Sequence, residues 1–250
     1  DSIWNEVFLS TSDAVTIENP FVSADLPLPD TTSAKINIEV TLQNHTADKT
    51  DGVLKVNFGE LTIEQPLSLS PAGKKVIVLN PDSHPALLLK NPKLWWPNGY
   101  GAPHLHDVKI EFITSAGVVS DTKSFKTGIR EMAYAEENGI LRIWINGRRF
   151  IGRGGNWGFP ESTLRYRSRE YDIAVRYHKD MNFTMIRNWV GQTGDEEFFE
   201  ACDRHGIMVW QDFWLANPVD GPNPFDNDLF MSNARDFVLK IRNHPSIALY

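Results

Sequence analysis

The sequence predicts a multidomain chain in which an antiparallel, immunoglobulin-like β-sandwich is followed by the first half of a (β/α)8 TIM barrel. Short runs of alternating apolar and polar residues extend as far as Gly128. After Gly128, apolar strand-like runs alternate with helical patterns. We therefore expect residues 1–18 to be the end of a preceding β domain and a linker, residues 19–131 the sandwich, and residues 132–250 barrel strands one to four, an incomplete barrel.

Strands in the first half are predicted by a period of two residues, which places alternate side chains on opposite faces. Residues 35–42 alternate in this way without a break. Further runs, separated by Gly, Pro, Asn and Asp, lie at residues 53–58, 61–69, 74–79, 106–113 and 122–127. No helical pattern separates them, which favours an antiparallel sandwich.

The second half opens with a predicted hairpin at residues 143–150, because Asn146-Gly147 supplies the two positive-φ residues of a type I′ turn. Parallel strands are expected at residues 150–154, 184–188, 207–210 and 247–250. Helices are expected at residues 168–181, in the segment that contains Phe198, Phe199 and Cys202 and ends at Gly206, and at residues 228–242.

Two of these helices carry local signals. The first shows one apolar helical face, made of Tyr171, Ala174, Val175, His178 and Met181. The second has capping-box spacing between Thr193 and Glu196, and Gly206 stands where a left-handed C-terminal cap belongs. A loop rich in Pro and Asn leads into the third helix.

Alternation of strands and helices indicates parallel pairing through right-handed crossovers, which a doubly wound sheet also satisfies. The barrel is preferred because polar and aromatic residues follow the strands, where barrel enzymes place their chemistry. The pairs are Asn156 with Trp157, Asn188 with Trp189, and Asp212 with Trp214. No Gly-rich phosphate loop of dinucleotide or Walker type is present in the sequence.

The composition and charge of the chain limit the classes of molecule that it is expected to bind. The net charge of −7, without a run of Lys or Arg, argues against nucleic acid or an anionic membrane, and a neutral, sugar-like substrate fits better. The histidines are scattered, so we predict no catalytic metal and no cofactor. The lone Cys202 is interpreted as a buried apolar residue. We expect any targeting signal to lie upstream of Asp1, and the compartment stays open.

Several segments, taken in order, resemble glycoside hydrolase family 2, particularly its β-mannosidase branch with the related endo-β-mannosidases and exo-β-glucosaminidases. They cover nearly the whole chain. The segments are Leu94-Trp95-Trp96-Pro97-Asn98-Gly99, Thr127-Gly128-Ile129-Arg130-Glu131, Ile145-Asn146-Gly147-Arg148, Arg153-Gly154-Gly155-Asn156-Trp157, Met181-Asn182 with Met185-Ile186-Arg187, Cys202-Asp203 with Val209-Trp210-Gln211-Asp212-Phe213, and Arg242-Asn243-His244-Pro245-Ser246-Ile247-Ala248-Leu249.

The resemblance implies retaining hydrolysis of a β-glycoside by two carboxylates about 5 Å apart, through a covalent glycosyl-enzyme. In the family, the segment similar to residues 244–250 leads within a few residues to an Asn-Glu pair that holds the general acid/base, and the nucleophile lies on a later strand. We therefore expect no catalytic residue in this chain and no activity from it alone. Many relatives have Trp-Gly-Gly-Gly where this chain has Trp189-Val190-Gly191-Gln192, so the loop bordering the sugar differs.

Seven residues are predicted to bind substrate: Asn156, Arg153, Trp157, Arg187, Trp189, Asp212 and Trp214. An aromatic ring stacks well on the apolar face of a pyranose. Trp189 is favoured for the site because it follows a predicted barrel strand and matches the family motif; Trp157 fits the site and the core equally. Trp95 and Trp96 are interpreted as structural and are expected in the sandwich.

The polar candidates have competing structural roles. Asp212 either contacts a sugar or a catalytic glutamate, or is a buried charge paired with an arginine. Arg153 and Arg187 are expected to point toward the centre of the barrel top, where they stabilise a carboxylate, or to form an ion pair with Asp212. Asn156 is a sugar or carboxylate ligand, or a turn residue.

Our first hypothesis is a fragment or subunit of a retaining β-glycosidase that hydrolyses β-mannosidic bonds, including the β-mannosyl linkage of N-glycan cores. Exo-β-glucosaminidase and β-galactosidase activities of the same family are alternatives. A different class of function is a non-catalytic sugar-binding or assembly module. In each case we expect further polypeptide, in the same chain or in other subunits, to supply barrel strands five to eight.

Overall fold

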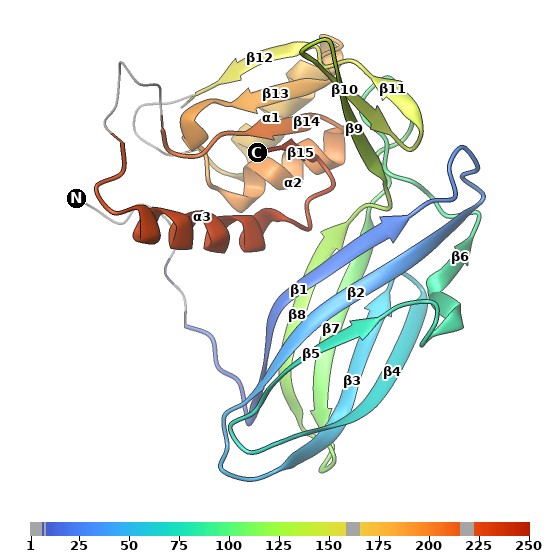
Figure 1. Cartoon of the computed structure of the whole chain (residues 1–250), viewed down its shortest axis with the longest axis vertical. Helices are drawn as coiled ribbons and strands as arrows, with labels where there is room; N and C mark the ends of the chain where they lie inside the picture. Colours follow the sequence, from blue (N-terminus) through green and yellow to red (C-terminus); the bar gives the residue numbers. More distant parts are fainter. Residues whose placement is uncertain (1–6, 8, 159–165, 216–222) are drawn as a thin grey trace. The chain divides into compact units, whose positions relative to one another are not determined.

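The computed structural model describes residues 7, 9–158, 166–215 and 223–250 of the 250-residue chain. The first six residues, within the segment expected to be a linker, and residues 216–222, within the expected Pro- and Asn-rich loop, lie outside the described residues. Two compact units can be distinguished (Figure 1). Unit 1 comprises Asp1–Ala24, Ala34–Lys90 and His106–Thr127, and unit 2 comprises Asp25–Ser33, Asn91–Leu105 and Gly128–Tyr250.

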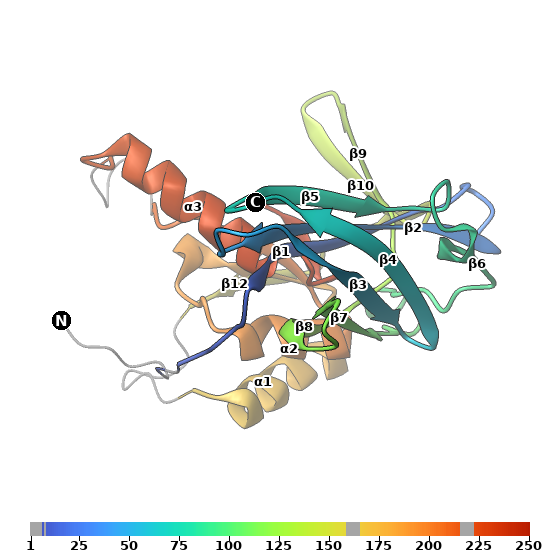
Figure 2. The same cartoon turned by 90° about the horizontal axis from the view of Figure 1, so that it is seen from below.

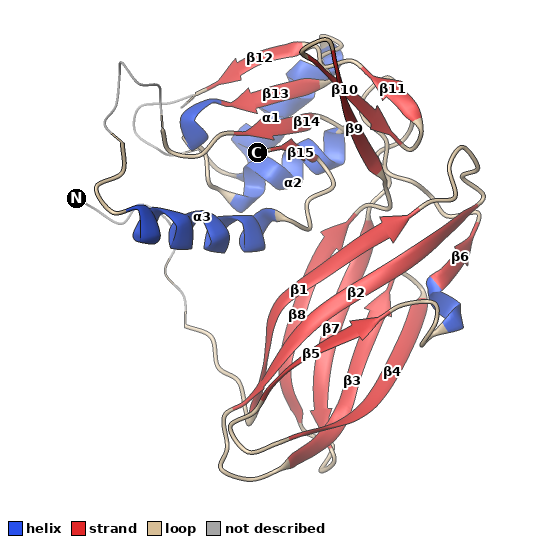
Figure 3. Ribbon diagram, viewed as in Figure 1, coloured by secondary structure: helices blue, strands red, loops and turns tan. Residues whose placement is uncertain are grey.

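Unit 1 consists of two facing β-sheets (Figures 1 and 3). The first has the order β1-β2-β5, with β6 also paired to β2, and its strands are β1 (Val15–Asp25), β2 (Ser33–Asn44), β5 (Lys74–Leu79) and β6 (Leu88–Lys90), which follows the 3-10 turn η1 (Pro85–Leu87). The second has the order β4-β3-β7-β8 and contains β3 (Thr50–Phe58), β4 (Leu61–Leu69), β7 (His106–Thr114) and β8 (Val119–Thr127).

The predicted strands of the first half are confirmed, because every expected run lies within β2, β3, β4, β5, β7 or β8. Apolar and polar residues alternate in these strands because one face of each sheet is buried. In β2, the residues Ala34, Ile36, Ile38, Val40 and Leu42 are all fully buried. On the facing sheet, Leu54, Val56, Ile110 and Phe112 are likewise fully buried, and β3 pairs antiparallel with both β4 and β7.

The longest segment of unit 2, Gly128–Tyr250, starts with an antiparallel β-meander. Its strands are β9 (Met132–Glu137), β10 (Ile140–Ile145) and β11 (Arg148–Phe150). The predicted turn is confirmed: Asn146 has φ 49° and Gly147 has φ 78°, and Ile145 pairs with Arg148. Asn and Gly tolerate this left-handed conformation better than other residues, which is why the pair closes the hairpin tightly.

A four-stranded parallel sheet forms the centre of unit 2. Its strands, in both chain and spatial order, are β12 (Gly154–Trp157), β13 (Met185–Asn188), β14 (Met208–Gln211) and β15 (Ile247–Leu249). Between them lie α1 (Ser168–Asp180), the 3-10 turn η2 (Trp189–Gly191), α2 (Glu196–His205) and α3 (Asn227–Ile241). Parallel pairing is confirmed for all three neighbouring pairs.

The three helices contribute to one apolar cluster against one face of this sheet. Tyr171 and Val175 come from α1, Phe198 and Phe199 come from α2, and Ile241 comes from α3. The sheet contributes Trp157, Ile186, Val209 and Ile247 to the same cluster. Helices α1 and α2 lie side by side (Figure 2). Gly206 has φ 72° and ends α2 as predicted, and Cys202 is fully buried.

The opposite face of the parallel sheet has a smaller apolar cluster near its amino end. Met208 and Ala248 pack there with Ile145 and Phe150 of the meander and with Trp95. Further along the same face, toward the carboxyl ends of the strands, side chains are more accessible: Trp210 is 40% exposed.

The first parallel strand is not at residues 150–154, as predicted, but at β12. Phe150 instead pairs with Ile143 in the hairpin. A Cβ added to Gly154 would lie 1.7 Å from the carbonyl oxygen of Met185, so the absence of a side chain permits this pairing. Asn156 and Trp157 are consequently strand residues, whereas the sequence predicted them after the strand.

Two details of the helices also differ from the prediction. The N-cap of α2 is Asp195, so Thr193 does not form the expected capping box. The hydroxyl of Thr193 instead accepts a hydrogen bond from Trp157. Met181 lies beyond the last residue of α1 and is 57% exposed, outside the apolar face assigned to it.

The segment 94–99 belongs to unit 2, whereas Trp95 and Trp96 were expected in the sandwich. Trp95 is fully buried, and its indole N–H donates to the carbonyl of Asp203 (2.9 Å). The Asn98 amide donates to the carbonyls of Lys179 (3.0 Å) and Phe183 (2.9 Å), which ties this segment to the end of α1 and to the chain that follows it. Trp95 therefore has a structural role, in unit 2.

Candidate functional site

The carboxyl ends of the four parallel strands meet at one edge of the sheet, and the candidate site is built there. In-register pairing places Asn156, Arg187 and Trp210 in one row. Because neighbouring side chains in register point to the same face, this row lies on the face opposite the helices. The next row, Trp157, Asn188 and Gln211, points toward the helices and is buried.

Arg187 and Asp212 form a bidentate ion pair at the carboxyl edge of the sheet. The Arg187 Nη2 lies 2.9 Å from Asp212 Oδ2, and its Nε donates to Oδ1 at 3.1 Å. Side-chain exposure is 36% for Arg187 and 12% for Asp212, so the pair is partly shielded from water. The guanidinium also lies over the Trp210 ring, 4.8 Å from its centroid. The predicted pairing of Arg187 with Asp212 is thus present.

Asp212 also fixes the turn η2 that follows β13. Its Oδ2 accepts a hydrogen bond from the Val190 backbone N–H (3.0 Å). Val190 has φ 49°, a left-handed conformation that is costly for a β-branched residue. Gly191 follows with φ 61°, and a Cβ there would lie 2.6 Å from the carbonyl oxygen of Asp212. The carboxylate therefore supports a strained turn at the candidate site.

Two exposed indoles border this turn. Trp189, the first residue of η2, is 37% exposed, and Trp214 is 43% exposed. The Trp214 Cδ1 would lie 3.3 Å from a Cβ on Gly191, so this ring is next to the turn. Phe230 and Phe237 of α3 also contact Trp214, with ring centroids at 6.0 and 5.6 Å. Such partly exposed rings can stack on the apolar face of a sugar.

Not every predicted site residue joins this group. Arg153 precedes Gly154, so its backbone lies at the amino end of β12, where its carbonyl accepts hydrogen bonds from Thr184 N and Met185 N. Trp157 is 7% exposed and packs against Phe198 with ring centroids 5.3 Å apart. The structure therefore assigns Trp157 to the core.

Asn156 keeps its place as a candidate. Its side chain is exposed in β12, level with Arg187. An exposed carboxamide beside a guanidinium offers both donors and acceptors to a sugar hydroxyl.

A buried amide network behind the edge was not predicted. Asn188, to which the sequence analysis gave no role, is fully buried, and its amide donates to Gln211 Oε1 (2.8 Å) and to the Thr193 carbonyl (2.7 Å). The Gln211 amide in turn donates to the carbonyl of Asp212 (2.7 Å). Amides at the ends of two apolar strands are the signal that could have indicated this network. This network fixes the backbone beside Trp189 and at Asp212.

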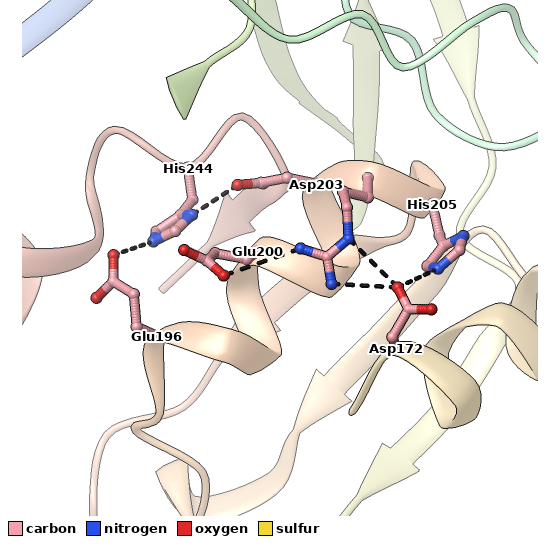
Figure 4. Close-up of polar contacts among 7 residues, drawn as sticks. Asp172, Glu196, Glu200, Asp203, His205 and His244 are labelled. Carbon is pink, nitrogen blue, oxygen red and sulfur yellow. Dashed lines mark hydrogen bonds and ion pairs between the residues drawn. The ribbon is translucent and has the colours of Figure 1, made fainter. Parts of the chain in front are cut away.

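A second buried polar group lies between α2 and β15 (Figure 4). His244 Nδ1 lies 2.6 Å from Asp203 Oδ2, and its Nε2 lies 3.1 Å from Glu196 Oε1. Burial by itself lowers the pKa of His244, but the charges and hydrogen bonds of Asp203 and Glu196 outweigh it and raise the pKa to about 10. The imidazole is therefore charged at neutral pH. Glu196, which was expected in a capping box with Thr193, pairs with this imidazolium.

Figure 4 also shows a surface group that joins α1 to α2. Asp172 accepts hydrogen bonds from Arg204 (3.1 Å to Nη2) and from His205 Nε2 (2.9 Å). In the described parts of the chain, no three His, Cys, Asp or Glu side chains are grouped so that they could hold a metal ion. None of the helices in those parts has the length and apolar character needed to cross a membrane.

Comparison with known proteins places the chain in a family. The sequence model of the family described as Glycosyl hydrolases family 2 matches residues 15–130. The mannosylglycoprotein endo-beta-mannosidase of Lilium longiflorum is 34% identical over 99% of this chain, and an exo-beta-D-glucosaminidase of Streptomyces avermitilis is 25% identical over 99%. The crystal structure of a beta-D-mannosidase from Dictyoglomus thermophilum covers 94% of this chain and 29% of its own, with a TM-score of 0.76 and 27% identity.

The relatives named above are glycosidases by name. The chain belongs to glycosyl hydrolase family 2, in the branch that holds β-mannosidases, endo-β-mannosidases and exo-β-glucosaminidases. It spans 28% of the length of each of the two curated relatives named above.

Proposed function

We propose that this chain is the part of a retaining β-glycosidase that carries one wall of its sugar site, and that the enzyme hydrolyses β-mannosidic bonds, including that of N-glycan cores. The observation that carries the proposal is the polar and aromatic edge at the carboxyl ends of β12 to β15. It is found in a chain that aligns over 99% of its length with an endo-beta-mannosidase.

The parallel sheet is, in this proposal, the first half of a (β/α)8 barrel. A doubly wound sheet carries helices on both faces, whereas here α1, α2 and α3 contribute to one cluster on one face. The other face carries Arg187 and Trp210, which would line the inside of a closed barrel. Polypeptide that supplies strands five to eight would cover that face.

The chemistry expected of the complete site is displacement by one carboxylate and general acid/base catalysis by another, both from polypeptide beyond Tyr250. Asp212 is not one of them, because three donors already occupy its oxygens. A carboxylate has about four acceptor positions, so Oδ1 keeps one for a sugar hydroxyl. Asp212 would orient the substrate and the Trp189 turn, and Arg187 would add positive charge beside a nucleophile.

Hydrolysis of β-glucosaminides is the second candidate, because a relative of that activity aligns over 99% of the chain. The loop that starts at Trp189 carries Val190 in place of the glycine found in many relatives. That loop borders the proposed sugar site, so its contacts would distinguish the two sugars.

The test compares this chain with the same chain extended by its downstream polypeptide. Only the extended protein should hydrolyse nitrophenyl β-mannoside, and NMR of the released sugar should show the β anomer first, as retention requires. If the extended protein hydrolyses only nitrophenyl β-glucosaminide, the proposed substrate is wrong and the proposed enzyme class stands. Activity of residues 1–250 alone, or an inverted product, would contradict the proposal.

A further inference from the structure

Side chains, in addition to a sheet ladder, hold the backbone of β15 in place. The Arg130 Nε donates to the carbonyl of Pro245 (2.5 Å), and its Nη2 donates to the carbonyl of Ile247 (2.6 Å). One rigid guanidinium thus spans two carbonyls that are two residues apart. Arg130, Pro245 and Ile247 all belong to unit 2.

Two more side chains form hydrogen bonds with the same stretch of backbone. The Tyr134 hydroxyl donates to the carbonyl of Ala248 (2.5 Å). Asp203 accepts from the Ser246 backbone N–H at Oδ1 (3.0 Å), and its other oxygen binds His244. Side-chain hydrogen bonds therefore link residues 245–248 to β9 through Tyr134, to α2 through Asp203, and to the segment between β8 and β9 through Arg130.

The ladder alone fixes β15 weakly. Val209 pairs with Ile247 and Trp210 with Leu249, so the register shifts between the two pairs. A strand of three residues with such an irregularity has few ladder bonds to set its height in the sheet. Donors from Arg130 and Tyr134 supply what the ladder lacks.

The end of β15 lies at the proposed sugar site. Tyr250 follows Leu249, and its ring stacks on Phe213 with centroids 6.1 Å apart and planes 19° from parallel. Phe213 is the residue after Asp212. A shift of β15 along its axis would therefore move the chain that enters the site next to Asp212.

We propose that Arg130 is a positioning residue of this site, with Tyr134 and Asp203 as its partners, and that it sets where the chain after β15 enters the sugar pocket. The inference rests on the proposed function. A lysine cannot replace the guanidinium, because one ammonium lacks the planar fork that reaches both carbonyls.

The experiment uses the full-length enzyme that contains this chain. We expect Arg130→Lys to lower kcat about 10-fold to 100-fold, because misplacement by about 1 Å has this effect, while KM stays within about threefold. Guanidinium ion at a non-denaturing concentration should partly restore kcat in Arg130→Ala. The matched control is Arg149→Ala, which removes a guanidinium that lies over Trp144 in the hairpin and should leave kcat unchanged.

Hydrogen exchange of the backbone amides gives a second result that does not depend on activity. In Arg130→Lys, amides of residues 246–250 should exchange faster while those of α1 keep their rates, and in Arg149→Ala both should stay unchanged. If the wild-type enzyme proves inactive on every glycoside, the proposed function fails and local exchange still decides whether Arg130 positions β15. Equal losses of protection throughout unit 2, or a kcat loss that guanidinium does not rescue, would overturn the inference.

Discussion

His244 shows how one buried side chain can make stability depend on pH. Its imidazole lies between Asp203 and Glu196, with a side-chain exposure of 8%. The pKa of His244 is about 10 in the folded chain, whereas an unperturbed histidine has a pKa of about 6.5. Since the folded pKa is the higher one, the stabilisation is fully present below about pH 6.5 and is lost as the pH rises through about 10.

Between these two pH values the folded chain holds one more proton than the unfolded chain at this residue. The free energy of unfolding should therefore fall by about 1.4 kcal/mol per pH unit from this group. His244→Gln should remove this part of the slope, measured by urea unfolding between pH 6.5 and 9. His205→Gln, which changes the surface contact with Asp172, is the control and should keep the slope. Identical slopes for all three proteins would contradict the assignment.

At the scale of elements, the turn η2 combines strain with support. Val190 is held at φ 49° by the carboxylate of Asp212, and Gly191 fits against the Asp212 carbonyl where a side chain would collide. A left-handed conformation costs an L residue about 1–2 kcal/mol, and glycine avoids this cost. The turn thus carries Trp189 at a position that the local sequence alone would not favour.

Val190→Gly should accordingly raise the free energy of unfolding by about 0.5–1 kcal/mol, because relief of strain exceeds the added entropy of the unfolded chain. Gly191→Ala should lower it by about 2 kcal/mol or more, since the new Cβ meets the Asp212 carbonyl. Urea unfolding measures both. Gly155→Ala is the control: its Cβ would find open space, and its effect should be small. Destabilisation by Val190→Gly would show that η2 is not strained.

Elements with a repeating pattern were predictable from the sequence, and long-range contacts were not. Burial of one face imposes alternation on β2, so its strand is visible in the residues themselves. β12 begins with Gly154 and Gly155, which carry no pattern, and it exists because β13 pairs with it. Similarly, His244 meets Asp203 across 41 positions in the chain, and only folding brings them together.

The candidate site was predictable in outline for the same reason. Trp189 and Asp212 directly follow strand patterns, so their meeting at one edge could be inferred. The first parallel strand was predicted too early, at residues 150–154, whereas β12 begins one residue after Arg153, so the backbone of Arg153 lies at the other end of the strand. For Trp157, burial favours the core, one of its two predicted positions.

At the scale of the whole molecule, the parallel sheet of unit 2 leaves one face partly uncovered in the described residues. Trp210 is 40% exposed on that face, and β12 and β15 are the outer strands of the described sheet. Open sheet edges and exposed aromatic rings favour association with other polypeptide.

Residues 1–250 alone should associate or aggregate as their concentration rises, and the extended polypeptide should not. Size-exclusion chromatography with light scattering would measure this. Trp210 fluorescence adds a local probe: its emission should shift to shorter wavelength in the extended protein, with Trp210→Phe used to isolate its signal. A compact, concentration-independent monomer of residues 1–250 would count against a half-barrel.

Unit 2 is assembled from three separate stretches of chain, and the middle one, Asn91–Leu105, leaves unit 1 after β6 and returns to it at β7. This stretch supplies Trp95 and Asn98, whose donors satisfy carbonyls of α2 and the end of α1. No single cut can therefore separate the two units with both intact. A fragment starting at Gly128 would lack Trp95 and would expose the surface that this ring covers, so unit 2 depends on a stretch of chain that interrupts the sequence of unit 1.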